Sequence, residues 1–460
     1  MPPAPDVAGT GLLARFITRL VGWAVALFFD VERTGPELVD GPLLVTANHP
    51  NALVDPLVIF RTGGRATRPL AKAPLFDQAL VGTVLRGLGG LPVYRREDDP
   101  ALMHLNERTF DAAIAALRRG EAVQIYPEGL SHSQPHLAPV KTGAARIALQ
   151  AEAGSGWTLG LRIQPVGLTY TRKHLFRGRV VAAFGEPFPV APYRDAFEAD
   201  EREGVQRLTD DVRGRLEGLT LSFDDAAERE MVEVAERLYT LEKRLVRWGD
   251  RPGMAERLPR LQRFAAGLRW LKATDPPRHA RLVQAMNRYL RLLTFFGAAE
   301  GDVPKHYRWG RVLRYTVGQS VAMTLLSPLA LAGGLLWAIP YQGTRRVWPM
   351  FRPKLDQVAT YKLSIAILVF PAWLGALALA GVLFWGLRPG LLVLPAAPIL
   401  GMAAVAWKER EERVREDLRV FFRAAWSRKG RDRLAELRGK LVTEIEEVAE
   451  EWRDATGGLA

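Results

Sequence analysis

The chain of 460 residues contains no cysteine, which excludes a disulfide scaffold, a cysteine-ligated zinc site and thiol catalysis. Internal repeats and low-complexity linkers are also missing from the sequence. Disorder is excluded, because 48% of the residues are hydrophobic, with 12 Trp and 19 Phe among them. Acidic residues number only 50 against 63 basic ones, a net charge of +13, which indicates an anionic partner, either nucleic acid or a membrane surface.

Charged residues are nearly missing from two long stretches. Residues 317–339 contain none, and residues 363–407 contain only Arg388. As a helix, residues 363–386 would be about 36 Å long, enough to cross a bilayer core of about 30 Å. We therefore predict a membrane hairpin over 363–407 that turns at Arg388-Pro389-Gly390, in preference to buried helices of a soluble core.

The stretch 317–339 is interrupted by Pro328 and by Gly333-Gly334, and both of its flanks are basic. The flanking residues are Arg308, Arg311 and Arg314 before it, and Arg345, Arg346, Arg352 and Lys354 after it. Basic flanks favour the cytoplasmic side of a membrane, so two of them favour a re-entrant, broken helix over a single crossing.

A shorter apolar run, residues 20–29, follows Arg15 and Arg19 near the N-terminus. Ten residues are too few to span a bilayer, and no small-x-small site follows them, which argues against a cleaved signal peptide. We predict that residues 1–32 form an interfacial amphipathic anchor.

Residues 33–195 alternate between strand and helix patterns. The expected strands are 43–46, 91–94, 122–126, 163–169 and 180–184, and the expected helices are about 74–87, 101–119 and 140–153. Such alternation is typical of an α/β domain in which helices cover a sheet.

Charged amphipathic helices replace the strands in two later regions, 196–310 and 408–460. In the second, apolar residues recur every three or four positions: Leu434, Leu437, Leu441, Ile445, Val448 and Trp452. We expect this stripe to pack against a neighbouring helix. The predicted fold is thus an α/β domain, an α-helical region 196–310, a transmembrane region 311–407 and a helical tail 408–460.

Histidine is scarce, with seven residues, and His49 stands out because it follows an apolar strand and precedes Asp55 by six positions. A histidine oriented by a carboxylate is the minimal general base. On a regular helix the two would lie about 240° apart. Since Pro56 disfavours helix at Asp55, we expect a loop or irregular turn. A structural His/Asp pair in a turn is the alternative reading.

Two further clusters follow apolar strands. The segment Ile125-Tyr126-Pro127-Glu128-Gly129-Leu130-Ser131-His132-Ser133 lacks the second glycine of a serine-hydrolase elbow. The segment 89–96 ends in Arg95 and Arg96, which can grip a phosphate or form a solvated basic turn. The chain contains no Walker loop and no dinucleotide fingerprint.

Taken in order, these clusters resemble the four blocks of the glycerophospholipid (phosphatidate-forming) acyltransferase family. The blocks are His49 to Asp55, Gly89 to Arg95, Tyr126-Pro127-Glu128-Gly129 and Ile163-Gln164-Pro165-Val166. The resemblance covers residues 35–190. The sequence is similar in particular to the branch with fungal glycerol-3-phosphate/dihydroxyacetone-phosphate acyltransferases. Five residues separate His49 from Asp55, whereas the common family pattern has four. Leu130-Ser131-His132 stands where the family often has Thr-Arg-Ser.

The resemblance implies a role for each block. His49 would deprotonate a hydroxyl of the acceptor, and Asp55 would orient His49. Arg95, Arg96 and Lys141 would bind the acceptor's phosphate. Glu128, Gly129, Ser131 and His132 would form the acceptor pocket, with backbone N–H groups near Gly129 available to an oxyanion.

The reaction implied is transfer of a fatty acyl chain from acyl-CoA or acyl carrier protein to glycerol 3-phosphate or 1-acylglycerol 3-phosphate, with neither a metal nor another cofactor. The partners would be a phospholipid membrane and these substrates, not nucleic acid, and the catalytic domain would face the cytoplasm. Acylation of another lysophospholipid is an alternative reaction. Two readings of a different class are a non-catalytic membrane-binding scaffold and a nucleic-acid-binding protein. A scaffold does not need the pair His49 and Asp55, and the basic residues gather beside apolar spans.

Overall fold

The computed structural model describes residues 12–94, 105–223, 226–243, 252–295, 309–425 and 428–457. The chain divides into two compact units. The first unit consists of residues 1–224, 253–258 and 347–367, and the second unit contains the remainder.

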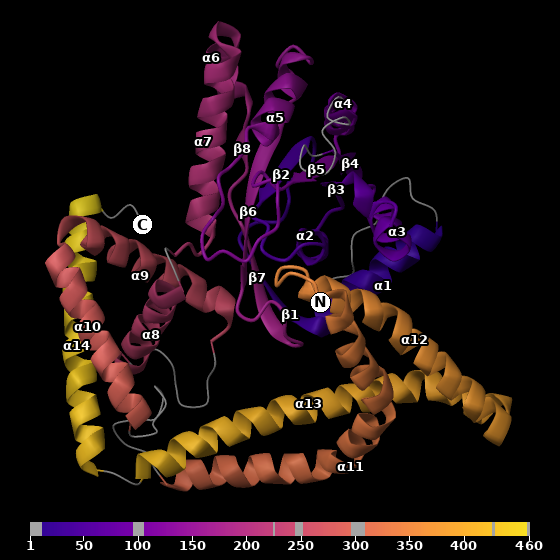
Figure 1. Ribbon diagram of the computed structural model, residues 1–460, viewed down its shortest axis with the longest axis vertical. Helices are drawn as coiled ribbons and strands as arrows, with labels where there is room; N and C mark the ends of the chain where they lie inside the picture. The colour runs from indigo at the N-terminus through magenta and orange to yellow at the C-terminus, as the bar shows by residue number, and fades with distance from the viewer. Residues whose placement is uncertain are drawn as a thin grey trace. The chain divides into compact units, whose positions relative to one another are not determined.

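An eight-stranded sheet lies at the centre of the first unit (Figure 1). Its strands are β1 (Phe29–Thr34), β2 (Leu43–Ala47), β3 (Thr67–Lys72), β4 (Leu91–Val93), β5 (Ala122–Ile125), β6 (Arg162–Tyr170), β7 (Gly178–Phe184) and β8 (Phe188–Pro189). They lie in the order β1-β7-β6-β2-β5-β3-β4, with β8 paired to β6. Every pair is parallel except β6 with β7 and β6 with β8. The carboxyl ends of β2, β5 and β6 therefore meet at one edge.

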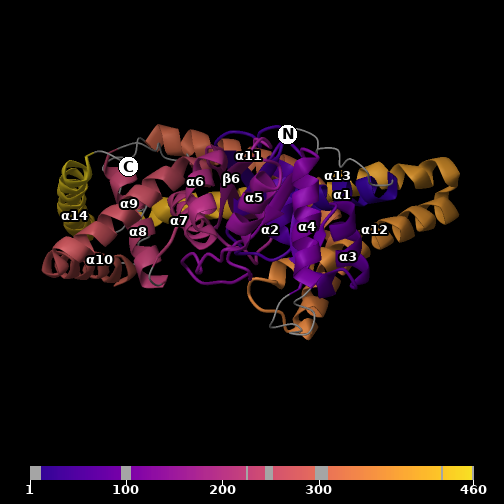
Figure 2. The ribbon, with the colours of Figure 1, turned by 90° about the horizontal axis from the view of Figure 1, so that it is seen from above.

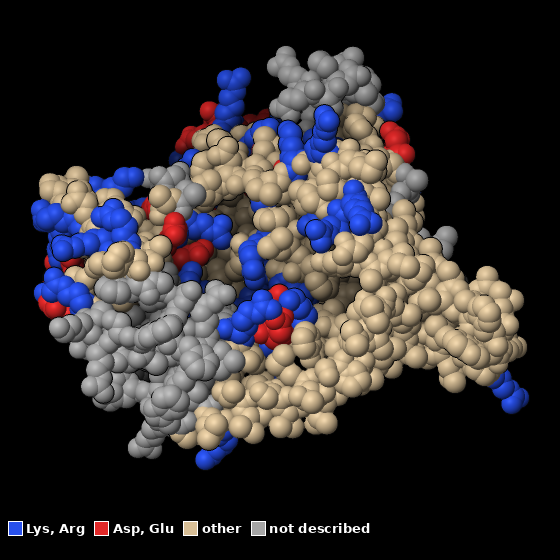
Figure 3. Space-filling model, turned by 60° about the horizontal axis from the view of Figure 1, so that its bottom comes forward, with Lys and Arg blue, Asp and Glu red and all other residues tan. Residues whose placement is uncertain are grey.

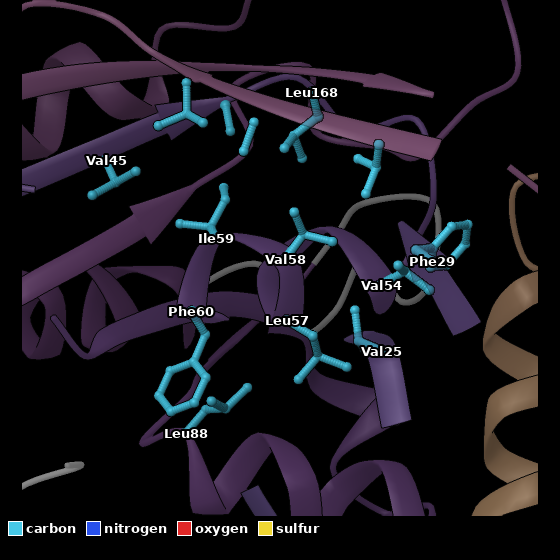
Figure 4. Packing of buried hydrophobic residues seen from close by; sticks show 14 of the residues in the cluster. Val25, Phe29, Val45, Val54, Leu57, Val58, Ile59, Phe60, Leu88 and Leu168 are labelled. Carbon is cyan, nitrogen blue, oxygen red and sulfur yellow. The ribbon is translucent and has the colours of Figure 1, made fainter. Parts of the chain in front are cut away.

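Helices cover both faces of the sheet, as the strand pattern predicts. One face carries α1 (Leu12–Phe28), α2 (Val54–Thr62) and α3 (Ala79–Gly87); the other carries α4 (Leu105–Arg118), α5 (Gly143–Ala153) and α7 (Glu201–Leu219). In the fully buried strand β2, Leu43 and Val45 point to the first face and Leu44 to the second. Figure 4 shows α2 packed by its apolar side chains beside Val45 and Leu168.

All five predicted strands are confirmed, as β2, β4, β5, β6 and β7, and the three predicted helices overlap α3, α4 and α5. Strands β1, β3 and β8 and helix α2 were not predicted. Strand β1 carries three charged residues in six, which a strand at the edge of a sheet tolerates because one side of it meets water. Strand β3 contains Pro69, and a proline argues against a strand in the sequence.

Both predicted boundaries of the α/β domain are wrong. Because β1 begins at Phe29, the domain starts within the segment assigned to the N-terminal anchor. The helix α1 is nevertheless present, and Val21, Val25 and Phe28 bury one of its sides in the core of the domain. At the other end, the helices α6 (Arg194–Ala199) and α7 pack on α5, so the domain extends past residue 195. The interfacial location of α1 stays a prediction.

The second unit contains the helices α8 (Ala226–Glu242), α10 (Pro276–Phe295) and α14 (Arg428–Thr456), together with most of α9 (Met254–Thr274). Helix α14 lies beside α10 and also contacts α8 (Figures 1 and 2). Most of the predicted apolar stripe is buried there, including Leu434, Leu441 and Trp452. The prediction that this stripe packs against neighbouring helices is confirmed.

Three further helices are long and apolar enough to cross a membrane: α11 (Trp309–Val347), α12 (Val358–Trp385) and α13 (Leu387–Ala425). Tryptophan side chains join them, since Trp337 donates to the carbonyl oxygen of Ala397 (2.8 Å) and Trp407 to that of Met323 (3.1 Å). Figure 3 shows a broad surface without charged side chains over these helices.

The expected break within 317–339 is wrong, because α11 continues through Pro328 and Pro340. Each proline removes the N–H that would bond the carbonyl four residues earlier. Those freed oxygens find other donors: the hydroxyl of Ser327 donates to Thr324 O (2.9 Å), and the indole of Trp373 donates to Leu336 O (2.9 Å). The helix therefore loses no buried hydrogen bond at either proline.

The structure has two successive helices, α12 and α13, where the hairpin was predicted, but the turn lies at Gly386, whose φ of +85° favours glycine, and not at residues 388–390. Gly390 instead allows the two helices to approach, because a β-carbon there would lie 2.3 Å from Val382 N. Helix α13 continues to Ala425, so the predicted boundary between the membrane region and the tail at residues 407 and 408 is wrong.

Candidate active site

His49 and Asp55 meet at the carboxyl edge of β2. The chain leaves β2 at Ala47, and α2 begins at Val54, so Asp55 lies in the first turn of a helix and not in a loop. The prediction for Asp55 is wrong because the first turn needs no N–H from Pro56. His49 Nδ1 lies 2.8 Å from Asp55 Oδ2.

Asp55 is completely buried, and two more donors reach its carboxylate. The backbone N–H of Asn51 donates to Oδ2 (2.7 Å), and the hydroxyl of Tyr170 donates to Oδ1 (2.7 Å). Burial, and then the charge of Asp55, raise the pKa of Tyr170 well above its usual range, so this hydroxyl stays a donor. Because a carboxylate only accepts, His49 carries its proton on Nδ1 and leaves Nε2 free as a base.

Tyr126, directly after β5, fixes the plane of the imidazole. Its ring stacks on that of His49 with 3.9 Å between centroids and 17° between planes. Burial, followed by the charge of Asp55, raises the pKa of Tyr126 well above its usual range. A neutral phenol ring therefore supports His49 from one side.

Glu128 connects the loop after β5 to the loop after β2. Its carboxylate, 1% exposed, accepts from the backbone N–H of His49 (2.7 Å) and of Ala138 (2.7 Å), and it pairs with His132 Nε2. In return, His132 N donates to His49 O (3.1 Å). These bonds hold the backbone of His49 at both its N–H and its carbonyl.

We expect Glu128→Gln to lower the free energy of unfolding by about 1–3 kcal/mol, because the new amide nitrogen cannot accept from one of these donors. Thermal or denaturant unfolding of the purified protein measures the change. Glu186→Gln, at an exposed position, is the matched control and should change stability by less than about 0.5 kcal/mol. Equal stabilities of the two variants would contradict this account of Glu128.

Gly129 and Lys141 also lie together. Gly129 has φ +74°, which favours glycine, and a β-carbon on it would lie 2.8 Å from Nζ of the exposed Lys141. The N–H of Gly129 donates to Tyr126 O (2.9 Å). The expectation that N–H groups near Gly129 are available to an oxyanion is therefore wrong for Gly129 itself.

The remaining predicted site residues divide into two groups. Ser131 and His132 lie in the loop that Glu128 begins, where the hydroxyl of Ser131 bonds the carboxylate of Asp356 and His132 pairs with Glu128. Arg95 and Arg96 lie outside the described residues.

Sequence reasoning missed Lys173, which follows β6 at the same edge of the sheet. Its ammonium group donates to Pro50 O (2.8 Å) and to His132 O (3.2 Å), and so bridges the two site loops. Asn48 was also missed; it exchanges two hydrogen bonds with the backbone of Leu168 (3.0 and 2.6 Å). The sequence offered one signal for these residues, the expected strand 163–169. If that strand is parallel to strand 43–46, the carboxyl ends of the two strands lie close together, and the residues that follow them do too.

A partly open apolar pocket lies beside the site. Leu53 and Val54, which directly precede Asp55, are among its lining residues. The other lining residues are Val21, Leu57, Val81, Val84, Thr360, Leu363, Ser364 and Ile367. A pocket of this composition suits a hydrocarbon group better than a polar one.

Residues 30–169 match the sequence profile described as Acyltransferase. An uncharacterised acyltransferase of Schizosaccharomyces pombe is 24% identical over 46% of this chain and 43% of its own length. Glycerol-3-phosphate O-acyltransferase 2 of Saccharomyces cerevisiae is 28% identical over 58% of this chain and 37% of its own length. The chain thus spans less than half the length of these relatives. Among solved structures, the 1-acyl-sn-glycerophosphate acyltransferase PlsC of Thermotoga maritima is 21% identical, with a TM-score of 0.32 over 44% of this chain and 78% of that one.

Proposed function

Since residues 30–169 are an acyltransferase domain of the glycerophospholipid acyltransferase family, we propose that this protein transfers a fatty acyl chain to the hydroxyl of glycerol 3-phosphate. The observation that carries the proposal is the buried Asp55 behind His49, which leaves Nε2 of the imidazole as an oriented base. One relative is named a glycerol-3-phosphate O-acyltransferase, which favours this acceptor over a lysophospholipid.

In the proposed mechanism, His49 Nε2 removes the proton of the acceptor hydroxyl as its oxygen attacks the thioester carbonyl of the donor. Asp55 stabilises the imidazolium that results, through the bond at Nδ1. Collapse of the tetrahedral intermediate breaks the carbon–sulfur bond, and the departing thiolate takes the proton back from His49. The products are an ester and a free thiol, and no covalent enzyme intermediate is needed.

We propose that the donor and the acceptor bind at different places. The fatty chain carried by acyl-CoA or acyl carrier protein would enter the apolar pocket that Leu53 and Val54 help to line. The phosphate of the acceptor would bind cationic side chains, for which Lys141 beside Gly129 is one candidate and Arg95 and Arg96 are the others.

A membrane location is part of the proposal. The helices α11, α12 and α13 are long and apolar enough for it, and we place the catalytic domain on the cytoplasmic side. A non-catalytic scaffold is the weaker alternative, because it would have no use for a buried carboxylate aimed at a histidine.

A panel of acceptors with radiolabelled acyl-CoA tests the proposal. We expect the purified protein to acylate glycerol 3-phosphate at least ten times faster than 1-acylglycerol 3-phosphate, with CoA released in equal amount. The reverse preference would assign the second acylation step instead. If no acceptor in the panel, including dihydroxyacetone phosphate, became acylated by either acyl-CoA or acyl carrier protein, the enzyme assignment would be wrong.

A further inference from the structure

Residues 347–367, which we name the returning segment, belong to the same compact unit as the candidate active site. The segment comprises the end of α11, a short 3₁₀ helix (Trp348–Phe351), a connection and the first residues of α12. Ala359 and Leu363 lie in the core cluster that also contains Val54 and Leu57 of α2. Burial of a leucine side chain contributes about 1.5–3 kcal/mol, so the segment is firmly packed against the domain.

Within this segment, Asp356 reaches one of the two site loops. Its carboxylate is 4% exposed and accepts a hydrogen bond from the hydroxyl of Ser131. Across the described residues, no other side chain bonds Asp356. A buried carboxylate with a single partner depends strongly on that partner, because its desolvation is otherwise uncompensated.

Lys362 makes a second connection. Its ammonium group donates to His174 O (2.6 Å) and lies 4.9 Å from the centre of the Trp348 ring. His174 follows Lys173, which bonds Pro50 and His132 in the two site loops. The returning segment is therefore joined to the site through Ser131 directly and through the turn after β6.

We propose that Asp356 is a positioning residue for His49. It acts by fixing Ser131, and with it the loop of residues 128–133, whose Glu128 and His132 hold His49 by its N–H and its carbonyl. This inference rests on the proposed function. It also means that a residue between two candidate membrane helices, far from the site in sequence, contributes to the acyl-transfer step.

The test compares Asp356→Ala and Asp356→Asn with Ser131→Ala, the double variant Asp356→Ala/Ser131→Ala, and the exposed control Lys354→Ala. We expect kcat to fall about tenfold in Asp356→Ala, equivalent to about 1.4 kcal/mol, while KM for the acceptor stays within twofold. Asp356→Asn keeps an acceptor for Ser131 and should recover most of the rate. The double variant should be no slower than either single variant, since both remove one interaction.

Hydrogen–deuterium exchange supplies a readout that does not need activity. Amides of residues 128–133 should exchange faster in Asp356→Ala, whereas those of β6 should not change. Wild-type kcat together with unchanged exchange, or losses that add in the double variant, would overturn the proposal. If Asp356→Ala is not recovered folded, Asp356→Asn and Ser131→Ala decide it. If the wild-type protein transfers no acyl group, the proposed function is wrong, and exchange alone still decides the coupling between Asp356 and the loop.

Discussion

His49→Ala is expected to lower the rate of acyl transfer by about 100- to 10,000-fold, the range that a general base contributes. The loss should appear in kcat more than in KM for the acceptor, because His49 Nε2 acts on the proton that moves in the transition state. Release of CoA from acyl-CoA, followed with glycerol 3-phosphate present and absent, measures the effect directly.

His136→Ala is the matched control, since His136 is exposed and follows the site loop of residues 128–133. It should retain wild-type activity. Melting temperatures of both variants separate a chemical loss from unfolding. Should His49→Ala release CoA at the wild-type rate while His136→Ala does the same, His49 would not be the base, and the family resemblance would not extend to the chemistry.

The pairing of His49 with Asp55 could be predicted because it depends on few residues close in sequence. A strand placed His49 at the sheet edge, and Asp55 lay within reach once the chain turned. The mistaken part was the turn itself: Pro56 disfavours helix at the preceding residue, but the first helical turn accepts proline. Residues close in sequence therefore predicted the correct pair of side chains, but a loop at Asp55 in place of the helical turn.

The supporting residues could not be predicted in the same way. Tyr170 and Lys173 reach the site only because β6 pairs in parallel with β2, which is a property of the sheet order. Asp356 is further still, since Ser131 lies 225 residues away from it in the chain. The periodicity of the sequence does not predict contacts between residues so far apart in the chain. It does predict the helices that flank the sheet, because these depend on local patterns.

The membrane region shows the opposite balance. Its apolar spans were evident from composition, and all three candidate crossings fall where uncharged runs were found. The continuity of α11 was not evident, because it depends on whether the carbonyls of Thr324 and Leu336 find substitute donors. Ser327, adjacent to Pro328, was a visible signal, while Trp373 comes from another helix.

Asp55→Asn is expected to remove nearly as much activity as loss of His49, about 100- to 10,000-fold, while the protein stays folded. Asp55 accepts from three donors, the side chains of His49 and Tyr170 and the backbone of Asn51. Asparagine has one acceptor oxygen and an NH₂ group, so it cannot serve all three. If the NH₂ group faces His49, the imidazole must accept at Nδ1 and carry its proton on Nε2, which leaves no base toward the acceptor hydroxyl.

Asp55→Ala separates the two roles of the carboxylate. It removes the acceptor of the Asn51 N–H and one partner of the buried Tyr170 hydroxyl, at about 1–3 kcal/mol each, so the melting temperature should fall far more than in Asp55→Asn. Asp77→Asn, at an exposed position, is the control for the change of charge and should affect neither property. Turnover and thermal unfolding of the three variants measure both effects. Wild-type turnover in Asp55→Asn would show that Asp55 does not set the tautomer of His49, and its burial would then serve stability alone.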